Sequence, residues 1–377
     1  MRNNVIKKLL AGIFLFLLWA PMLQQNLKVF KGGELRGAYV VPTDTALTAQ
    51  TWFNGIYAAR ETNFLRSSFG FQGDVIRLYN QIQYNVFDIA GTENVVIGKQ
   101  GYIYEQRYID SYYGKNFTGD EKLIKRAAAA KELQDTLARH GIFLFTVFAP
   151  GKGSFYPEYI PNNKRRKRGK TSIESCVAAY KKAGVNYIDF ESYLISIKDT
   201  SKYPLYSRGG IHWTYYGEVL VFDSILKYIK GATNYSLPSL KIKSIQVTDQ
   251  PRFRDCDAGD ALNLISLGYH DTLAYPDFAF SDTNKRTLNF MAVGDSYYWM
   301  MQLYFTPLVF DNCSFWYYMG NLYSNRAAPV QSADASKQVK DIVLKQNVIC
   351  IIQTDAGLAE PGLGFFDLAN SKFKANR

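Results

Sequence analysis

The chain has 377 residues, of which 47% are hydrophobic and 20% are charged, and its formal net charge is +11. This composition is typical of a globular protein with one large or two moderate domains, and it excludes a disordered chain. A strongly basic balance favours an anionic partner, such as a membrane surface or an acidic polymer. We expect no nucleic-acid partner, because the sequence contains no zinc-finger spacing, RNP motif or P-loop.

The N-terminus has the order of an export signal. Arg2, Lys7 and Lys8 precede an uncharged apolar run at Leu9–Leu23, and basic residues before an apolar run are typical of a secretory signal or a signal-anchor. No A-x-A cleavage site follows the run, so we favour an uncleaved anchor at 1–24 over a cleaved signal peptide. In either case the long remainder of the chain is exported.

Residues 25–94 are predicted to form a membrane-proximal helical leader. Gln25–Val41 reads as a connector, and Thr45–Ser67 and Gly73–Asp88 have helical spacing. We expect the aromatic side chains of these helices to pack in a core: Trp52, Phe53, Tyr57 and Phe64.

A sheet with intervening helices is indicated from residue 95 onwards. Strands are predicted at Val95–Ile97, Ile142–Phe148 and Asn186–Phe190. The second of them has no charge, as expected of a parallel strand that is covered on both faces. A helix is predicted at Thr171–Ala183, and the basic run Asn163–Lys170 before it reads either as a solvated loop or as a contact with an acidic polymer or lipid headgroups.

A longer helix is predicted between the first two of these strands. Thr118 and Glu121 match a T-x-x-E capping box, and the helix that it opens ends at His140-Gly141. Its apolar face is formed by residues at helical spacing: Leu123, Ala127, Ala130, Leu133 and Leu137.

His212 is the best candidate for a general base among the three histidines. In Ser207–Leu220 (SRGGIHWTYYGEVL) it follows two glycines and precedes a helical pattern that runs to about Lys230, so we expect it on a loop entering a helix. His270, in a polar loop, is second, and His140 is most simply a cation near a helix C-terminus. A lone loop histidine is more often structural or solvated, and that alternative stays open.

Ser296 is the candidate nucleophile. It lies in Asn289–Trp299 (NFMAVGDSYYW), where an apolar strand ends in the turn Gly294-Asp295-Ser296. Ligands and chemistry collect at the carboxyl edge of a parallel sheet, and the backbone N–H groups of the turn could hold an oxyanion. A serine acts as a nucleophile only if a base reaches it, and Gly-Asp-Ser is also an ordinary turn sequence.

The remaining segments complete the expected sheet. Lys230–Asp282 reads as a polar excursion, and Thr306–Phe310 and Val348–Ile352 read as strands. The last strand leads to Asp355, a carboxylate in the same kind of place as Ser296. Because no internal repeat or low-complexity linker occurs, one catalytic-sized α/β domain at 95–377 is the simplest organisation.

Metal chemistry has little support in the sequence. CxxC and HExxH motifs are absent, so we expect no metal site and no cofactor. The spacing of Asp255, Asp257 and Asp260 does not match an EF-hand loop. Cys350 lies in an apolar run and is predicted to be a buried free thiol, while the sequence leaves open how the four cysteines pair: Cys176, Cys256, Cys313 and Cys350.

Four segments in a fixed order resemble one family. Gly294–Ser296, with His212-Trp213 upstream, is similar to the SGNH/GDSL hydrolase-like domains of the alginate O-acetyltransferase type, the AlgJ and AlgX family. Gly98–Tyr104 resembles the G-K-x-G-aromatic segment of that family, and Pro150–Glu158 resembles its P-x-K…YPE segment. The histidine motif precedes the serine motif, as it does there, and the resemblance covers roughly Val95–Ile352.

The resemblance implies an SGNH-hydrolase-like α/β fold, a doubly wound parallel sheet flanked by helices, after the N-terminal membrane anchor. It implies that Ser296 is the nucleophile and His212 the base of an acyl transfer. By the same resemblance, an acetyl group moves onto a cell-surface or exported polysaccharide, with a membrane-bound O-acyltransferase as the donor. The protein would then face the periplasm from the inner membrane, or lie in the periplasm if the signal is cleaved.

This sequence departs from the family at the acid. The family pattern is Asp-x-His-Trp, and Gly210 stands at the Asp position. Another acid substitutes, a Ser–His dyad suffices, or the site is degenerate, and Asp355 is our candidate substitute. Candidates for contact with the substrate or the oxyanion are residues near the motifs: Gly294, Asp295, Lys152, Tyr297 and Arg326.

Three functions are therefore compatible with the sequence. The first is a polysaccharide O-acetyltransferase, in which a sugar hydroxyl resolves an acetyl-enzyme formed on Ser296. The second is a carbohydrate O-acetyl esterase that uses the same residues with water as the acceptor. The third is a non-catalytic polysaccharide-binding or assembly protein, which is favoured by Gly210 at the Asp position.

Overall fold

The chain forms two compact units in the computed structural model, which describes residues 2–30, 32–33, 35–36, 46–281, 286–326 and 328–374. One unit comprises Met1–Glu93 and Gly259–Gly268, and the other comprises Asn94–Ala258 and Tyr269–Arg377. We call the first the helical unit and the second the sheet unit. The division at 1–24, 25–94 and 95–377 remains a prediction from the sequence.

The sheet unit is built on a six-stranded sheet with the order β4-β3-β10-β7-β8-β9. Neighbours from β4 to β8 pair in parallel, and β9 pairs antiparallel with β8 at the edge, so the predicted parallel sheet is mixed at one strand. The predicted α/β fold is confirmed. The strands are β3 (Phe143–Ala149), β4 (Tyr187–Asp189), β7 (Arg286–Gly294), β8 (Phe310–Tyr317), β9 (Leu322–Ser324) and β10 (Val348–Thr354).

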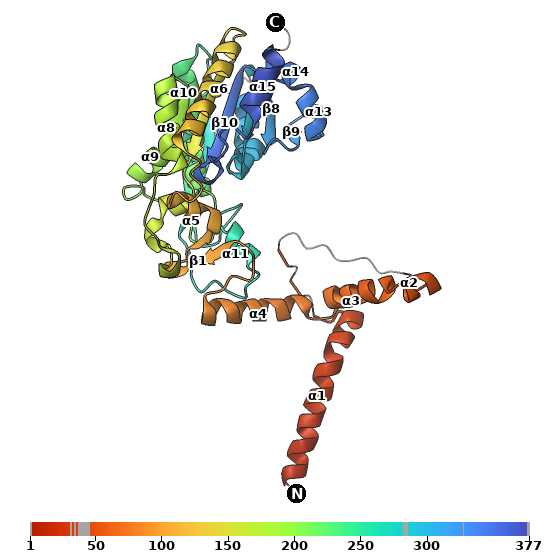
Figure 1. The fold of residues 1–377 in the computed structure, drawn as a ribbon. Helices are drawn as coiled ribbons and strands as arrows, with labels where there is room; N and C mark the ends of the chain where they lie inside the picture. Colours follow the sequence, from red (N-terminus) through yellow and green to blue (C-terminus); the bar gives the residue numbers. More distant parts are fainter. Residues whose placement is uncertain are drawn as a thin grey trace. The chain divides into compact units, whose positions relative to one another are not determined.

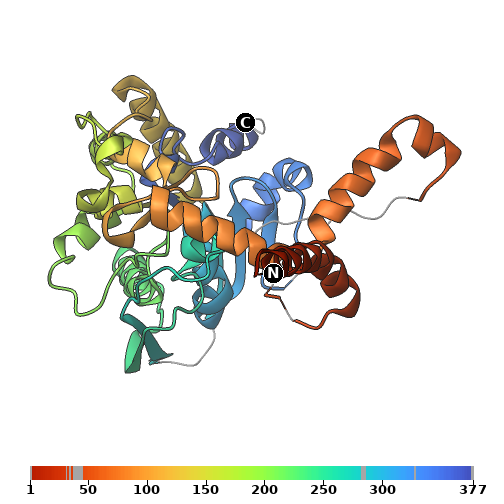
Figure 2. The same ribbon diagram turned by 90° about the horizontal axis from the view of Figure 1, so that it is seen from below.

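Helices cover the sheet on both faces, which explains why β10 has no charged residue and is buried along its whole length (Figures 1 and 2). On one face, α6 (Asp120–Ala138), α8 (Ser172–Ala183) and α15 (Phe365–Lys374) share a core with the side chains of β10 and β7. On the other face, the rings of Phe143 and Phe145 lie 6.1 and 5.5 Å from Tyr228 of α10 (Tyr215–Ala232).

The helix ends follow the local sequence with one exception. The face of α6 predicted to be apolar is buried, and the helix ends before Gly141, which has a φ of 72°. The predicted capping box at Thr118 is wrong, because α6 begins one residue later, with Gly119 at the N-cap and no side-chain cap. A capping box does form at α8, between Thr171 and Glu174.

The predicted strand at Thr306–Phe310 is also wrong. The chain after Ser296 stays helical through η4 (Ser296–Tyr298), η5 (Met301–Phe305) and α12 (Thr306–Val309), and β8 begins only at Phe310. Thr306 is held inside this helical stretch, since its Oγ1 lies 2.8 Å from the hydroxyl of Tyr298. A short apolar run does not by itself separate a strand from a buried helix.

The predicted polar excursion at 230–282 contains an antiparallel pair, β5 (Leu240–Thr248) and β6 (Leu273–Phe280). A second small pair is formed by β1 (Val95–Ile97) and β2 (Ile103–Glu105). The other short elements are η1 (Lys99–Gly101), α5 (Gln106–Tyr112), α7 (Lys152–Phe155), η2 (Pro157–Tyr159), η3 (Asn162–Lys164), α9 (Phe190–Ser196), α11 (Asp257–Ala261), α13 (Ser332–Lys337), α14 (Val339–Leu344) and η6 (Asp355–Gly357).

The helical unit contains α1 (Arg2–Leu27), α2 (Ala49–Phe53), α3 (Ile56–Ser68) and α4 (Gln72–Phe87). Within the described residues one helix is long and apolar enough to cross a membrane, over Asn4–Leu27. The predicted connector overlaps the end of α1, and its part at 37–41 lies outside the described residues. The expected packing of aromatic residues in a core is wrong for Trp52 and Phe53, which are 58% and 86% exposed.

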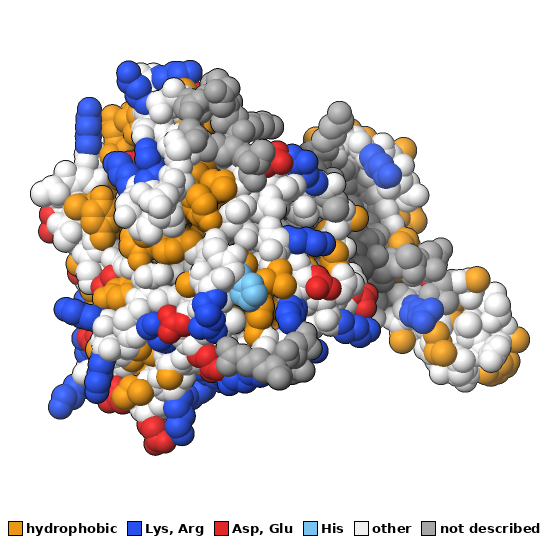
Figure 3. Space-filling model, turned by 90° about the horizontal axis from the view of Figure 1, so that it is seen from above, with side chains coloured by type: hydrophobic (Ala, Val, Ile, Leu, Met, Phe, Trp, Pro, Cys, Tyr) orange, Lys and Arg blue, Asp and Glu red, His pale blue; other side chains and the backbone are white. Residues whose placement is uncertain are grey.

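Many basic side chains lie on the surface, and the cysteines are buried. Figure 3 shows Lys and Arg side chains spread over one face of the molecule, in keeping with the basic composition. In the basic run at 163–170, Arg166, Arg168 and Lys170 form ion pairs with nearby carboxylates. All four cysteines are buried and none forms a disulfide in the described residues, which confirms the buried thiol predicted for Cys350.

Gly294 is the position where the sheet tolerates no side chain. A Cβ there would lie 2.4 Å from the carbonyl oxygen of Ile352 on β10. We expect Gly294→Ala to lower the free energy of unfolding by about 3 kcal/mol, the upper end of overpacking costs. Urea-induced unfolding of the full chain in detergent micelles measures this.

Gly231→Ala is the matched control, because a Cβ on Gly231 in α10 meets no atom within 4 Å. That substitution is expected to raise the free energy of unfolding by about 0.5 kcal/mol, since alanine restricts the unfolded chain more than glycine does. Equal stability of the two variants would contradict the role assigned to Gly294.

Candidate active site

Ser296 lies directly beyond the carboxyl end of β7. The preceding Asp295 is buried, and its carboxylate accepts hydrogen bonds from the backbone N–H of Tyr297 at 3.0 Å and from the N–H and hydroxyl of Thr354 at 2.7 and 2.8 Å. Asp295 thereby ties the end of β7 to the end of the neighbouring β10. The turn that carries Ser296 is fixed by a side chain that points away from the reaction centre.

His212 lies on the loop that enters α10, as the sequence predicts. The buried side chain of Lys152 holds this loop, since its Nζ donates to the carbonyl oxygens of Arg208 at 2.6 Å and Gly210 at 2.8 Å. The hydroxyl of Tyr297 donates to the carbonyl of Ile211 at 3.0 Å. The backbone that leads into His212 is therefore fixed by side chains that follow the ends of β3 and β7.

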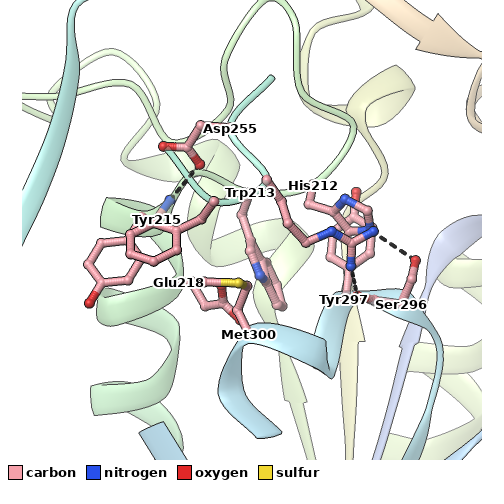
Figure 4. Close-up of a pocket in the computed structure, with 10 residues that line it drawn as sticks. His212, Trp213, Tyr215, Glu218, Asp255, Ser296, Tyr297 and Met300 are labelled. Atoms are coloured by element: carbon pink, nitrogen blue, oxygen red, sulfur yellow. Dashed lines mark hydrogen bonds between the residues drawn. The ribbon is translucent and has the colours of Figure 1, made fainter. Parts of the chain in front are cut away.

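The two predicted groups meet. The Ser296 Oγ lies 2.9 Å from the His212 Nε2, and Figure 4 shows the hydroxyl and the imidazole facing each other across the pocket. On the other side of the ring, the His212 Nδ1 lies 2.6 Å from the Oδ2 of Asp257. Serine, histidine and aspartate thus form one hydrogen-bonded chain with the connectivity of a hydrolase triad.

Asp257 is held as an ionised acceptor. Its Oδ1 accepts the backbone N–H groups of Ile211 and Ala258, both at 2.9 Å, while the guanidinium of Arg254 lies 3.5 Å from Oδ2. Burial alone would raise the pKa of Asp257, but the electrostatic interaction and hydrogen bond with His212, the charge of Arg254 and the hydrogen bond from Ile211 outweigh it and lower the pKa. A carboxylate in this state fixes the imidazole tautomer with the proton on Nδ1.

Gly210 explains why the acid comes from another segment. A Cβ at position 210 would lie 2.6 Å from the Ser207 hydroxyl and 3.0 Å from the carbonyl oxygen of Asp255. The segment that carries Asp255 and Asp257 thus passes where the side chain of the family's aspartate would begin. The carboxylate reaches the same nitrogen of His212 from the excursion between β5 and β6.

Asp355 is not the acid beside His212, which corrects the expectation from the sequence. Its carboxylate is fully buried, and Oδ2 accepts a hydrogen bond of 2.5 Å from the hydroxyl of Ser154. Burial raises the pKa of Asp355 to about 7, and burial together with the charge of Asp355 raises that of Glu191 to about 8. These two acids form a separate buried cluster at the same sheet edge.

The other predicted site residues divide into positioning and remote groups. Lys152 and Tyr297 fix the His212 loop, and the Tyr297 ring lies 4.8 Å from the imidazole. Burial lowers the pKa of Lys152 to about 7, although the nearby acids Asp271 and Asp257 oppose the shift. Arg326 instead donates to the carbonyl oxygen of Asp311 on β8 at 3.1 Å, and it is hydrogen-bonded to neither Ser296 nor His212 in the part of the chain that the structure describes.

The two remaining histidines lie elsewhere. His270 is exposed, and its carbonyl oxygen accepts a hydrogen bond from Arg208 at 2.8 Å. His140 lies beyond the end of α6, where its ring is 5.8 Å from that of Phe373. Neither is hydrogen-bonded to a serine in the part of the chain that the structure describes, so His212 is the histidine with a base's geometry.

A pocket opens beside Ser296, and several of its polar residues were not found from the sequence. Arg254 Nη1 donates to the carbonyl oxygen of Ser296 at 2.9 Å. Glu218 is buried with its Oε1 unpaired among the described residues, and burial raises its pKa well above the ordinary value. The lining residues include His212, Trp213, Tyr215, Glu218, Phe253, Arg254, Asp255, Ser296, Tyr297 and Met300 (Figure 4).

Two signals in the sequence pointed weakly to these residues. Asp255 and Asp257 stand out as acids in a polar excursion, and their spacing does not match an EF-hand loop. Glu218 lies in the first turn of α10, where an acid is ordinary because it complements the helix dipole. Their approach to Ser296 depends on how β6 and α10 pack, which no local pattern encodes.

The fold and this geometry agree with a comparison against protein families. The model of the SGNH hydrolase-like domain of acetyltransferase AlgX matches residues 95–288. The chain belongs to this family. It is accordingly an enzyme of the SGNH acyltransferase type, and the resemblance predicted from the four segments is confirmed. The match includes His212 and Asp257 and ends before Ser296.

One of the solved structures that are similar to this chain supports the fold. The O-acetyltransferase domain of Pseudomonas putida AlgJ has a TM-score of 0.50 and 17% identity, and the match covers 74% of this chain and 99% of that domain. Pseudomonas aeruginosa AlgX follows with a TM-score of 0.45 and 12% identity, covering 76% and 70%. Bacillus cereus PatB1 with a sulfonyl adduct has a TM-score of 0.45 and 10% identity, covering 71% and 96%. A search of curated proteins gave no match.

Asp257→Asn is expected to slow the reaction of Ser296 with a sulfonyl fluoride. An amide cannot stabilise the imidazolium and can hold the wrong tautomer, which lowers the rate by about 10²- to 10⁴-fold. Mass spectrometry of the Ser296 peptide over time measures the labelling rate on the full chain.

Two control variants separate the possible acids. Asp260→Asn removes a neighbouring acid whose carboxylate pairs with Arg36 and is expected to leave the rate unchanged. Asp355→Asn is likewise expected to keep a rate close to that of the parent chain. A loss with Asp355→Asn and none with Asp257→Asn would restore the assignment made from the sequence.

The buried acids predict a pH-dependent stability. Asp355 and Glu191 hold their protons to higher pH in the folded chain than at their ordinary pKa values of 3.8 and 4.5, so the free energy of unfolding falls as pH rises from about 4.5 to 7. Each such proton contributes up to about 1.4 kcal/mol per pH unit. Asp355→Asn is expected to reduce the change of the free energy of unfolding with pH, whereas Asp367→Asn, at an exposed position, is expected to leave that change as it is. Urea unfolding at several pH values measures both.

Proposed function

We propose that this protein is an O-acetyltransferase that acts on a cell-surface or exported polysaccharide, with Ser296 as the nucleophile. The observation that supports it is the hydrogen-bonded chain from the Ser296 Oγ through His212 to Asp257, in a member of an acetyltransferase family. His212 is the general base in this proposal, and Asp257 takes the orienting role that the sequence gave to Asp355. No cofactor is needed for these steps.

The reaction proceeds in two transfers through one ester. Ser296 Oγ attacks the carbonyl carbon of the donor's acetyl group and gives its proton to His212 Nε2, which passes that proton to the leaving group. The acetyl group is then an ester on Ser296. A sugar hydroxyl gives its proton to the same nitrogen and attacks the ester carbon, and Ser296 leaves as the free hydroxyl when it takes that proton back.

The negative charge on the carbonyl oxygen needs fixed donors near Ser296. In the turn, the Asp295 N–H donates to the carbonyl of Ile352 at 3.2 Å and the Tyr297 N–H donates to Asp295, so both are already used. We assign the oxyanion to the backbone N–H of Ser296 itself. Arg254 adds a positive charge at the same pocket, where it is bound to the Ser296 carbonyl.

The N-terminal helix supports a place at the membrane. A basic start followed by a span of membrane length and apolarity is typical of a signal-anchor, and we propose that α1 keeps the sheet unit on the periplasmic face of the inner membrane. If the signal is cleaved, the protein is periplasmic. A membrane-bound O-acyltransferase is the proposed donor of the acetyl group.

The non-catalytic alternative loses its main argument. Gly210 suggested a missing acid, and Asp257 provides a carboxylate at 2.6 Å from the same imidazole. The esterase differs from the transferase only in the acceptor, since water and a sugar hydroxyl present the same O–H group to His212. The molecule that resolves the ester on Ser296 therefore distinguishes the two functions.

Ser296→Ala in the producing bacterium is expected to abolish the acetylation of its surface polysaccharide, because no acetyl ester can form without the hydroxyl. Ser371→Ala, on the exposed side of α15, is the control and is expected to keep it. Acetate released by mild alkali from purified polysaccharide gives the measurement. Unchanged acetate with Ser296→Ala rules the proposal out.

The purified full chain in micelles distinguishes transferase from esterase. With a nitrophenyl acetate donor and an oligosaccharide acceptor, the transferase predicts acetylated oligosaccharide and faster release of nitrophenol, since the sugar resolves the ester on Ser296. Release that the acceptor does not change, with free acetate as the product, identifies an esterase instead.

A further inference from the structure

The helix α4 has an apolar face turned outward. Its exposed side chains follow helical spacing and carry no charge, and each is between 49% and 66% exposed: Val75, Leu78, Tyr79, Ile82 and Val86. A surface helix normally presents its polar side to water and buries the apolar one. Here the described residues leave the apolar stripe without cover.

The opposite face of α4 is polar and is the one that contacts the rest of the helical unit. Arg77 donates to the carbonyl of Gly33 at 2.8 Å, and Asn80 donates to the carbonyl of Leu262 at 2.9 Å. Gln81 accepts the backbone N–H groups of residues 265 and 266, both at 2.9 Å. Hydrogen bonds to the segment Gly259–Gly268 therefore fix the rotation of α4 about its axis. Because the polar face makes these bonds, the apolar stripe on the opposite face is exposed.

The stripe begins close to the end of the candidate membrane span. A Cβ on Gly70, in the turn before α4, would lie 2.2 Å from the carbonyl oxygen of Pro21 and 2.6 Å from the Cβ of Gln24, so α1 and this turn are in direct contact. Figures 1 and 2 show α3 and α4 running from this point across the direction of α1. A helix that leaves the end of a span at such an angle runs along the membrane surface.

We propose that α4 lies in the headgroup region of the membrane that α1 crosses, with Val75, Leu78, Tyr79, Ile82 and Val86 among the acyl chains. The proposal rests on the anchoring role given above to α1. A lipid surface fits better than a second copy of the chain, because the stripe is continuous with the point where α1 leaves the bilayer, and lipid is already present there. Apolar side chains of an amphipathic helix bind such an interface.

Helix α2, which packs against α3 at the end away from α4 (Figure 1), adds a second contact of the same kind. Trp52 and Phe53 are more than half exposed, at 58% and 86%. Tryptophan and other aromatic side chains are enriched where acyl chains meet headgroups. The helical unit is thus a platform on the membrane and not only a tether, and the residues expected from the sequence to form a protein core contact lipid instead.

Spin labels on the full chain in vesicles of phosphatidylethanolamine and phosphatidylglycerol test this. Leu78→Cys, Ile82→Cys and Val86→Cys carry the label in turn, and the chain's own cysteines are buried. Oxygen concentrates in lipid, and a nickel complex stays in water. We expect the ratio of oxygen collisions to nickel collisions to be several-fold higher for these labels than for a label at Lys372→Cys, an exposed position of α15. Reaction of Ser296 with the sulfonyl fluoride verifies that each labelled chain is folded.

The possible outcomes are distinct. Free access of the nickel complex to the three positions overturns the proposal, since the stripe then faces water. Low collision rates with both reagents also overturn it, because protein and not lipid then covers the stripe. A label at Leu15→Cys tests the membrane span of α1 separately. If that label is in water while the labels on α4 are in lipid, the anchoring role of α1 is contradicted and the membrane contact of α4 is supported.

Discussion

The hydrogen bond between the Asp257 carboxylate and the His212 Nδ1 is the interaction on which the site depends. It joins two segments that are separated in the chain by α10 and β5: the loop before α10 and the segment between β5 and β6. With Nδ1 engaged, Nε2 is left to face the Ser296 hydroxyl. The fixed tautomer makes the imidazole an acceptor at the one nitrogen that the serine can reach.

The supports of this bond come from the carboxyl edge of the sheet. Lys152 after β3 holds the His212 loop, and Asp295 after β7 ties the serine turn to Thr354 at the end of β10. Parallel strands bring these three ends to one edge, so groups that lie far apart in the sequence share one small volume. Burial of an ammonium and a carboxylate here is tolerated because each has several hydrogen-bond partners.

The acid beside His212 comes from a segment distant in the sequence. A side chain at position 210 would crowd the Ser207 hydroxyl and the carbonyl oxygen of Asp255, and Asp257 brings its carboxylate to the His212 Nδ1 from the segment between β5 and β6. The segment that delivers it continues directly into Gly259–Gly268, the stretch that binds the polar face of α4. One excursion of the chain thus supplies the acid of the site and turns the apolar face of a helix outward.

The sequence by itself determined the α/β class, the strands that end at Ser296 and Asp355, and the loop that carries His212. It could do so because uninterrupted apolar runs, caps and glycine turns are local signals. Only the tertiary structure decided which acid orients His212 and which face of α4 is covered. Both depend on contacts between segments far apart in the chain. The spacing of apolar and polar residues along one helix or strand does not specify which other segment packs against it.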